Sequence, residues 1–450
     1  MSEHGHWQPY PAYKDSVVNW IGRIPKHWQT RRLKYAAPES GSKLIEKPDE
    51  LPYLGLENIE SNTGRLLLDN PIEEVESTVV VFKKSDVLFG KLRPYLAKVV
   101  HASFDGVGTT ELLVLRPKDD VDSQFLFYHL LADGFIDTVN GLTYGTKMPR
   151  ANSGQVGNLV IGLPPLSEQC TIAAFLDRET ARLDALVARQ ERLIELLQEK
   201  RAALISHTVT KGLDPTVPIK DSGISWLGEI PAHWEVRRLK FIADVQSGIA
   251  KGRNLEGKKI VELPYLRVAN VQNGYLDLSD VATITIAEDE IKRYSLQVND
   301  VLMTEGGDYD KLGRGTVWEG QIIPCVHQNH IFAVRPHQGM NSSWISMITQ
   351  TDYARHYFIL RSKQTTNLAS ISSTNLIEFP VVLPPGSEQQ AILSYLDSET
   401  TKLDALIAKV RALIERLQEY RTALISAAVT GKIDVREQEQ VQRTSEVRCT

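Results

Sequence analysis

The stretch LPPLSEQCTIAAFLDRETARLDALVARQERLIELLQEKRAALISHTVTKGLD, residues 163–214, occurs twice in this chain. Its second copy is LPPGSEQQAILSYLDSETTKLDALIAKVRALIERLQEYRTALISAAVTGKID, residues 383–434, and the two agree at 30 of 52 positions without a gap. Self-similarity of this length indicates an internal duplication. The fold is therefore expected to be one structural unit built twice.

Each copy has the heptad pattern of a long helix. Apolar residues recur every seven positions and would form a single seam along the helix. They are Leu176, Leu183, Leu197 and Leu204 in the first copy, and Leu396, Leu403, Val410, Leu417 and Leu424 in the second. About 40 helical residues at 1.5 Å each make a rod of roughly 60 Å.

The ends of these helices also carry recognisable signals. Ser167 and Ser387 are predicted to cap the first turns, and Gly212 and Gly431 stand where the helices should end. One such helix alone could simply pack on its own domain. Two helices with the same seam can satisfy one another, so we expect an antiparallel coiled coil about a local two-fold axis.

The segments between the repeats have the pattern of mixed α/β domains. Short β-rich runs such as GTTELLVLRP and NHIFAVRP alternate with loops, and helical pieces at 123–139 and 342–358 precede the last strand of each half. The predicted class is α+β. The expected domains are 1–165 and 214–385, with long helices at 166–213 and 386–435 and a disordered tail at 436–450.

A shorter motif is also repeated near the start of each half. NWIGRIPKHWQTRRLK (19–34) recurs as SWLGEIPAHWEVRRLK (225–240), and LPYLGLENI (51–59) recurs more weakly as LPYLRVANV (263–271). In the first of these motifs, two tryptophans flank an Ile-Pro turn. This arrangement is typical of a packing knot rather than of a variable surface.

Composition limits the classes of function. The net charge of -5 gives no overall attraction for nucleic acid, so any such surface must be local. Cys170, Cys325 and Cys449 are scattered, which excludes a disulfide framework or a Cys-rich zinc module. The sequence has no apolar run of 18 residues and no signal segment, so a cytoplasmic location is expected.

Motifs that would indicate catalysis are incomplete. KGRNLEGKK (251–259) approaches a phosphate-binding loop, but Lys259 stands where that loop needs Ser or Thr to hold magnesium. In CVHQNH (325–330), Cys325, His327 and His330 suggest a metal, yet alternate residues of a strand face opposite sides and no second cluster exists. The sequence therefore predicts neither catalytic residues nor a metal site.

Two loops in each half mix basic, amide and aromatic residues. Such side chains contact phosphates and read the edges of bases. The candidates in the first half are Lys91, Arg93, Tyr95, Lys98, Tyr144, Thr146, Lys147 and Arg150. The candidates in the second half are Asp308, Lys311, Arg314, Arg361, Lys363, Gln364, Thr365, Thr366 and Asn367. Any single loop also fits ordinary polar surface, but recurrence at comparable places favours DNA binding.

Taken together, these features resemble the specificity subunit of a type I restriction-modification system over essentially the whole chain. The resemblance is carried by LPPLSEQ and LPPGSEQ before the heptad helices, by LDALVA and LDALIA within them, and by WIGRIPKHW and WLGEIPAHW. GKLRPYLAKV, MTEGGDYDKLGRG and CVHQNHIFAVRP resemble parts of the family's target-recognition domains.

The resemblance implies a function and a set of partners. Each half would read one part of a bipartite site on double-stranded DNA, and the helices would form the spacer that sets the gap. The conserved regions would bind two methyltransferase subunits carrying S-adenosylmethionine, and restriction subunits using ATP and Mg would complete the complex. The chain itself would carry no cofactor and no catalytic group.

Within this framework, RRLK is a poor candidate for choosing bases, because it stays alike while the loops diverge. We interpret the motif as the shared start of each recognition domain, leaving Arg31, Arg32, Arg237 and Arg238 for a phosphate or a partner subunit. The competing hypotheses are a coiled-coil adaptor with two protein-binding domains and an NTP-using enzyme based on residues 251–259.

Overall fold

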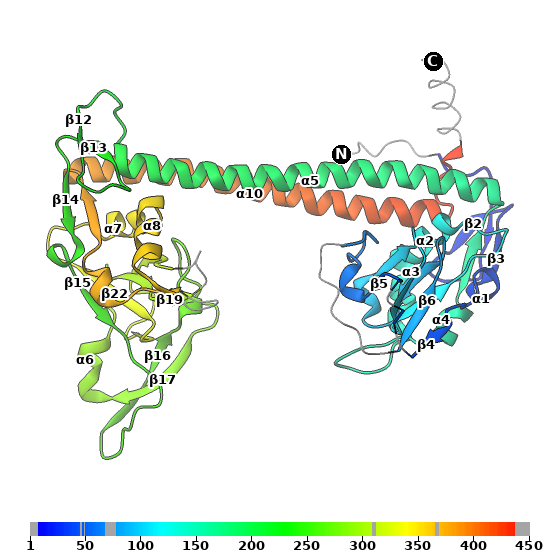
Figure 1. Cartoon of the computed structure of the whole chain (residues 1–450), viewed down its shortest axis with the longest axis horizontal. Coiled ribbons are helices and arrows are strands. Elements are labelled where there is room, and N and C mark those ends of the chain that lie inside the picture. Colours follow the sequence, from blue (N-terminus) through cyan, green and yellow to red (C-terminus); the bar gives the residue numbers. More distant parts are fainter. Residues whose placement is uncertain are drawn as a thin grey trace. The chain divides into compact units, whose positions relative to one another are not determined.

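The structure is a computed structural model that describes residues 8–45, 47–48, 50–67, 78–307, 312–364 and 369–436. The chain forms two compact units, Met1–Glu191 with Arg411–Thr450, and Arg192–Val410. Two long helices, α5 (Leu166–Lys211) and α10 (Gly386–Val429), are labelled in Figure 1, and each contributes one part to the first unit and the rest to the second. The predicted α+β fold with two mixed units and two long helices is confirmed.

The first unit contains the strands and short helices that precede α5. Its strands are β1 (Tyr13–Asp15), β2 (Arg23–Pro25), β3 (Gln29–Arg32), β4 (Lys43–Leu44), β5 (Tyr53–Leu54), β6 (Val79–Phe82), β7 (Val87–Gly90), β8 (Val99–His101), β9 (Gly106–Thr109), β10 (Leu112–Leu115) and β11 (Val160–Leu163). Its helices are α1 (Leu33–Ala36), α2 (Ser123–Leu131), α3 (Asp133–Gly141) and α4 (Ser153–Asn158).

Mixed and antiparallel sheets form the body of the first unit. A four-stranded sheet has the order β4-β6-β9-β5, with β5 parallel to β9, and a three-stranded antiparallel sheet has the order β10-β7-β8. Strand β11 pairs with β3, so the last strand of the unit returns to the IPKHW motif. Pro164 and Pro165 follow β11 directly and cannot donate further ladder bonds, so the chain turns into α5 there.

The second unit repeats this plan between α5 and α10. Its strands are β12 (Ile219–Asp221), β13 (Glu229–Pro231), β14 (Glu235–Arg238), β15 (Ala243–Ser247), β16 (Ile260–Leu266), β17 (Ala282–Ala287), β18 (Val301–Thr304), β19 (Gly306–Gly307), β20 (Gly315–Val317), β21 (Val326–His327), β22 (Ile331–Pro336), β23 (Lys363–Gln364), β24 (Ala369–Ser370) and β25 (Pro380–Leu383). Its helices are α6 (Ile291–Tyr294), α7 (Ser342–Thr349), α8 (Asp352–Arg361) and α9 (Ser373–Leu376).

The two units share both strand pairing and internal support. Strand β14 pairs with β25 as β3 pairs with β11, and β18 pairs with β22 as β7 pairs with β10. In the first unit Arg116 forms an ion pair of 2.7 Å with the buried Asp86. In the second unit Arg335 does the same with Asp300, also at 2.7 Å. The weak sequence echoes therefore come from one common fold.

The long helices pack together within each unit. In the first unit Leu183 of α5 belongs to the same buried cluster as Leu424 of α10. In the second unit Leu197 of α5 clusters with Leu403 and Ile407 of α10. Asp184 pairs with Arg421 in the first unit and Arg201 with Asp404 in the second, which is the same contact made by repeated residues. The helices run antiparallel in each unit, as the heptads predicted.

One detail of the helix ends was predicted wrongly. The helices begin at Leu166 and Gly386, so Ser167 and Ser387 lie inside the first turn and are not caps. The first free N–H groups are bound instead by backbone oxygens, because Pro165 O accepts from Glu168 N at 2.9 Å and Pro385 O accepts from Glu388 N at 2.9 Å. Gly212 (φ +78°) and Gly431 (φ +69°) follow the helices in the left-handed region, as expected. None of the described helices combines the length and apolar character needed to cross a membrane.

A fully buried histidine in α2 is expected to make the first unit sensitive to acid. The ring of His129 lies 5.4 Å from that of Trp20 and 5.9 Å from that of Phe125, and burial lowers the pKa of His129 to about 3. His129 therefore binds a proton near pH 6.5 in the unfolded chain but stays neutral at that pH in the folded chain. The free energy of unfolding is expected to fall by up to about 1.4 kcal/mol per pH unit as the pH drops from 6.5 toward 3.

The second unit supplies the matched substitution. Asp122 caps α2 and Asn341 caps α7, and counting from these caps places Ile348 where α2 has His129. His129→Ile is expected to flatten the loss of stability between pH 7 and pH 5, measured by urea unfolding at both values. An identical pH dependence in the two proteins would contradict this assignment.

Candidate nucleic-acid interface

The two candidate loops of the first unit lie side by side. Arg93 N donates to Pro149 O at 2.7 Å, and Ala151 N donates to Lys91 O at 2.9 Å. Tyr144 and Arg150 exchange two backbone hydrogen bonds of 3.1 Å. Loops separated by some fifty residues in the sequence thus form one surface. Tyr95 and Tyr144 expose about half of their side chains there, at 49% and 59%.

The candidate side chains of this surface have different surroundings. Lys147 and Thr146 are exposed, and Arg150 donates to Glu111 Oε1 at 2.6 Å. Burial lowers the pKa of Lys91, although Glu111 and Glu39 act in the opposite direction. Burial also lowers the pKa of Lys98, whose Nζ donates to Leu56 O at 2.5 Å. Lys98 therefore supports the turn at Leu56.

The second unit brings its two loops together in the same way. Ile371 N donates to Glu305 O at 2.9 Å, and β24 pairs with both β19 and β23. Lys363 lies in β23, Arg361 ends α8 and is exposed, and Arg314 O accepts from Thr304 N at 3.0 Å. Five candidates lie outside the described residues, namely Asp308, Lys311, Thr365, Thr366 and Asn367. The side chain of Gln364 lies outside them as well.

Composition missed three residues at these surfaces. Glu111 pairs with Arg150, and the Nδ1 atom of His330 lies 2.7 Å from Glu305 Oε2. A lone acidic residue beside the end of a strand carries no sequence signal, and His330 was weighed as a metal ligand. Only the backbone pairing of distant segments shows that these side chains share the candidate surface.

The weak metal and nucleotide motifs have other roles in the structure. Cys325 and His327 are buried, and Nδ1 of His327 lies 3.0 Å from Ile331 O, while burial lowers the pKa of His327 to about 4. In the described ranges, no three His, Cys, Asp or Glu side chains are placed to hold a metal ion. In loop 251–259, Arg253 forms an ion pair with Glu290.

The repeated IPKHW and IPAHW motifs hold the body of each unit to the long helices. Trp28 is fully buried, and its Nε1 donates to Glu168 Oε1 at 2.9 Å in the first turn of α5. Its neighbour His27 lies 2.7 Å from the same carboxylate. A Cβ on Gly431 would lie 2.4 Å from Pro25, so the end of α10 also meets this motif.

The second unit makes two of these three contacts. His233 lies 2.8 Å from Glu388 at the start of α10, and Gly212 at the end of α5 packs against Trp234. The predicted packing knot is confirmed, because Trp28 and Trp234 are fully buried and Trp20 and Trp226 are partly buried against the same two cores. Three of the four RRLK arginines already have carboxylate partners, because Arg31 pairs with Asp120, Arg237 with Glu235 and Arg238 with Glu378.

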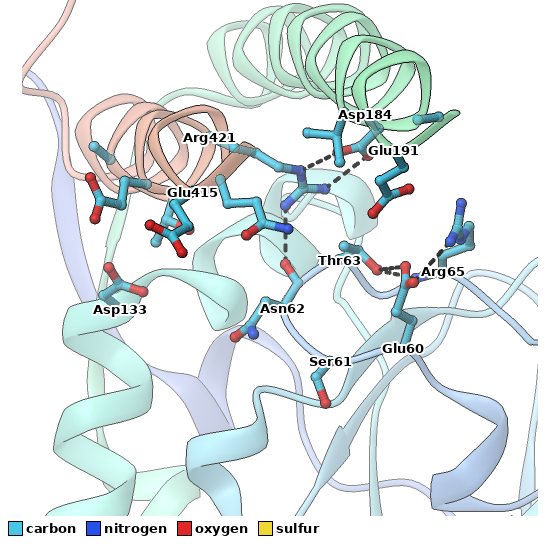
Figure 2. Close-up of a pocket in the computed structure, with 16 residues that line it drawn as sticks. Glu60, Ser61, Asn62, Thr63, Arg65, Asp133, Asp184, Glu191, Glu415 and Arg421 are labelled. Carbon is cyan, nitrogen blue, oxygen red and sulfur yellow. Dashed lines mark hydrogen bonds and ion pairs between the residues drawn. The ribbon is translucent and has the colours of Figure 1, made fainter. Parts of the chain in front are cut away.

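A cavity of about 700 Å³ in the first unit is unsuited to DNA. Its lining includes the carboxylates Glu60, Asp133, Asp184, Glu191, Glu415 and Glu419 (Figure 2). The two lining arginines are already neutralised, Arg65 by Glu60 at 2.8 Å and Arg421 by Asp184 at 2.9 Å. Phosphates would be repelled here, so the paired loops described above are the better candidates for a nucleic-acid interface.

The fold and these surfaces define a duplicated binding protein. The chain matches the family described as Type I restriction modification DNA specificity domain over residues 25–196 and 231–416, and it belongs to that family. It is the DNA specificity subunit of a type I restriction-modification system, a non-catalytic component of that complex. The resemblance drawn from the sequence is thereby confirmed.

Two relatives show the extent of the likeness. The EcoKI type I restriction enzyme specificity subunit of Escherichia coli K12 is 23% identical over 325 residues, 71% of this chain and 68% of that protein. The MjaVIII specificity subunit of Methanocaldococcus jannaschii is 23% identical over 439 residues, 92% of this chain and 95% of that protein.

A solved structure agrees with the fold. It belongs to work described as the structural basis of complex assembly and conformational transition of the type I R-M system. It aligns with a TM-score of 0.63 at 21% identity, covering 91% of this chain and 99% of that one. At this identity the likeness supports the fold alone.

Proposed function

We propose that each unit reads one half of a bipartite site on double-stranded DNA, through recognition domains at 1–165 and 214–385. The observation that carries this proposal is the duplication of one scaffold with different loops. The repeat keeps the Asp-Arg supports and the tryptophan knots but changes the exposed loop residues. Two copies with different loops suit a DNA site whose two halves differ.

The proposed DNA contacts are the paired loops of each domain. Lys91, Arg93, Tyr144 and Arg150 would act in the first unit, and Arg314, Arg361 and Lys363 in the second. Arginine and lysine bind phosphates and guanine edges, and exposed tyrosines can add stacking or phosphate contacts. Because the chain as a whole is acidic, partner subunits would supply much of the basic surface around the duplex.

The long helices would set the unspecified gap and bind the partners. Two modules that read one face of DNA one turn apart need centres roughly 34 Å apart. The 46-residue α5 spans about 69 Å at 1.5 Å per residue, so the two helices are long enough for this role. Two methyltransferase subunits with S-adenosylmethionine, and restriction subunits using ATP and Mg, would complete the complex.

The test is the methylated motif in living cells. Expressed with its methyltransferase subunit, the chain is expected to direct adenine methylation to one split motif, detected by single-molecule sequencing. Exchanging residues 1–165 for those of another family member should change one half-site and leave the other half and the gap unchanged.

A coiled-coil adaptor with two protein-binding domains would behave differently. It would assemble with partners but show no sequence-dependent DNA binding, and the exchange would leave any methylation pattern as it was. Either result would overturn the proposed function.

A further inference from the structure

The recognition domains place different side chains on the same backbone. In the first unit Lys91 N donates to Glu111 O at 2.8 Å, and Lys91 O accepts from Ala151 N at 2.9 Å. In the second unit Glu305 N donates to His330 O at 2.9 Å, and Glu305 O accepts from Ile371 N at 2.9 Å. Lys91 and Glu305 therefore occupy the same position, and so do Glu111 and His330.

The third segment of each surface extends this equivalence. Arg150 and Tyr144 form an isolated antiparallel β-bridge. In the second unit Ser370 of β24 is paired in the same way with Lys363 of β23. Arg150 directly precedes Ala151, which binds Lys91, and Ser370 directly precedes Ile371, which binds Glu305. We name these four positions the recognition strip: Lys91, Glu111, Arg150 and Tyr144 in the first unit, and Glu305, His330, Ser370 and Lys363 in the second.

The supports around the strip keep their chemistry while the strip changes at every position. The ion pair of Asp86 with Arg116 corresponds to that of Asp300 with Arg335. In each unit this pair lies at one end of two paired strands, and the strip lies at the other end. Directly after the strip, Asn152 caps α4 and Ser372 caps α9 through their side-chain oxygens. If the strip only stabilised the fold, its residues should have been retained like these supports. A strip that varies beside supports that are retained is what a reading surface requires.

The two strips offer opposite hydrogen-bonding chemistry. Lys91 and Arg150 are donors around one carboxylate, and Arg150 exposes 46% of its side chain. Cationic donors suit guanine, whose major-groove edge presents two acceptors. In the second unit the position of Lys91 is taken by the Glu305 carboxylate, which accepts hydrogen bonds from the amino group of cytosine or adenine. His330 lies beside that carboxylate and exposes 56% of its side chain.

We propose that the recognition strips are the specificity-determining contacts of the two domains. The first reads a guanine through Lys91 and Arg150, and the second reads the exocyclic amino group of a cytosine or adenine through Glu305. This inference rests on the proposed function, because it requires each unit to read one half-site.

The experiment transplants the strip chemistry between the units of the full chain. One variant carries Lys91→Glu with Glu111→His, and the reciprocal variant carries Glu305→Lys with His330→Glu. Each is expressed with its methyltransferase subunit, and methylated sites are determined by single-molecule sequencing. Lys14→Glu and Glu319→Lys are the controls, because both residues are exposed and lie outside the strip.

Each transplant is expected to change one base pair in one half-site. A bidentate contact discriminates against the wrong base by roughly 5- to 150-fold. The rate of methylation of the original site should therefore decrease by a factor in that range. The other half-site, the gap and both controls should be unaffected. Whether the second unit's altered position is a cytosine or an adenine identifies which amino group Glu305 reads.

Single conservative variants guard against loss of folding. Lys91→Gln and Glu305→Gln keep the size of each side chain and should relax the same positions, with assembly checked by copurification of the methyltransferase subunit. Assembled variants that methylate the original motif at the original rate would overturn the recognition strip alone. Absence of any split motif for the unsubstituted chain would overturn the proposed function as well.

Discussion

Replacing Glu168 with alanine is expected to lower the free energy of unfolding of the first unit by about 3 kcal/mol. Its buried carboxylate accepts hydrogen bonds from the hydroxyl of Tyr10 at 2.7 Å and from Nε1 of Trp28 at 2.9 Å. Both donors are almost fully buried. Without Glu168 they would lose their acceptor, and each unsatisfied buried donor costs about 1–3 kcal/mol.

The second unit provides the matched control, Glu388→Ala. Glu388 is 28% exposed and is paired with His233, itself 44% exposed. Within the described residues, Nε1 of Trp234 has no hydrogen-bond partner, so removing Glu388 orphans no buried indole. Its loss should cost less than about 1 kcal/mol.

Urea unfolding of each full chain measures the difference, and hydrogen exchange in β3 and β14 assigns it to one unit. Glu168→Gln should fall between wild type and Glu168→Ala, because it keeps an acceptor oxygen but loses the charge. Equal losses for Glu168→Ala and Glu388→Ala would refute the assigned role of Glu168.

The same carboxylate explains what sequence reasoning could and could not predict. The repeat of LPPLSEQ and the heptads predicted the helices because their signals are local and periodic. The burial of Trp28 and Trp234 followed from the repeated Ile-Pro turn. That Glu168 binds Trp28 across 140 residues was not predictable, because nothing in either motif names the other as its partner.

The sequence predicted the basic loops of the candidate site but not the acidic residues that lie beside them. Lys91 and Arg150 stand out by composition, and the structure places both loops on one surface. Glu111 and Glu305 stand out only when two segments of each unit are aligned by their backbone hydrogen bonds. The RRLK arginines show what a basic cluster leaves out, since Arg31 and Arg238 have carboxylate partners in the same unit.

Arg421→Ala is expected to destabilise the first unit by about 2 kcal/mol, well beyond the effect of Arg201→Ala in the second. Arg421 exposes 8% of its side chain and lies 2.9 Å from Asp184. It also donates to Asn62 O at 3.0 Å, which connects α10 to a loop of the recognition domain (Figure 2). Removing it would leave a carboxylate and a carbonyl without their donor.

Arg201 is the residue that the duplication places in the same role. Its pair with Asp404 has a longer separation of 3.3 Å, and the two side chains are 27% and 57% exposed. Exposed pairs contribute about 0–1 kcal/mol, so Arg201→Ala should fall in that range. Urea unfolding with hydrogen exchange in each unit compares the two variants under one set of conditions.

A double-mutant cycle separates the ion pair from the loop contact. Asp184→Asn removes the charge partner but leaves Arg421 bound to Asn62, so Arg421→Ala in that background should still lower stability. If Arg421→Ala had no effect once Asp184 is neutralised, the contact with Asn62 would contribute nothing. A residual loss of about 1 kcal/mol is expected for that hydrogen bond to a charged donor, because it ties α10 to Asn62 independently of Asp184.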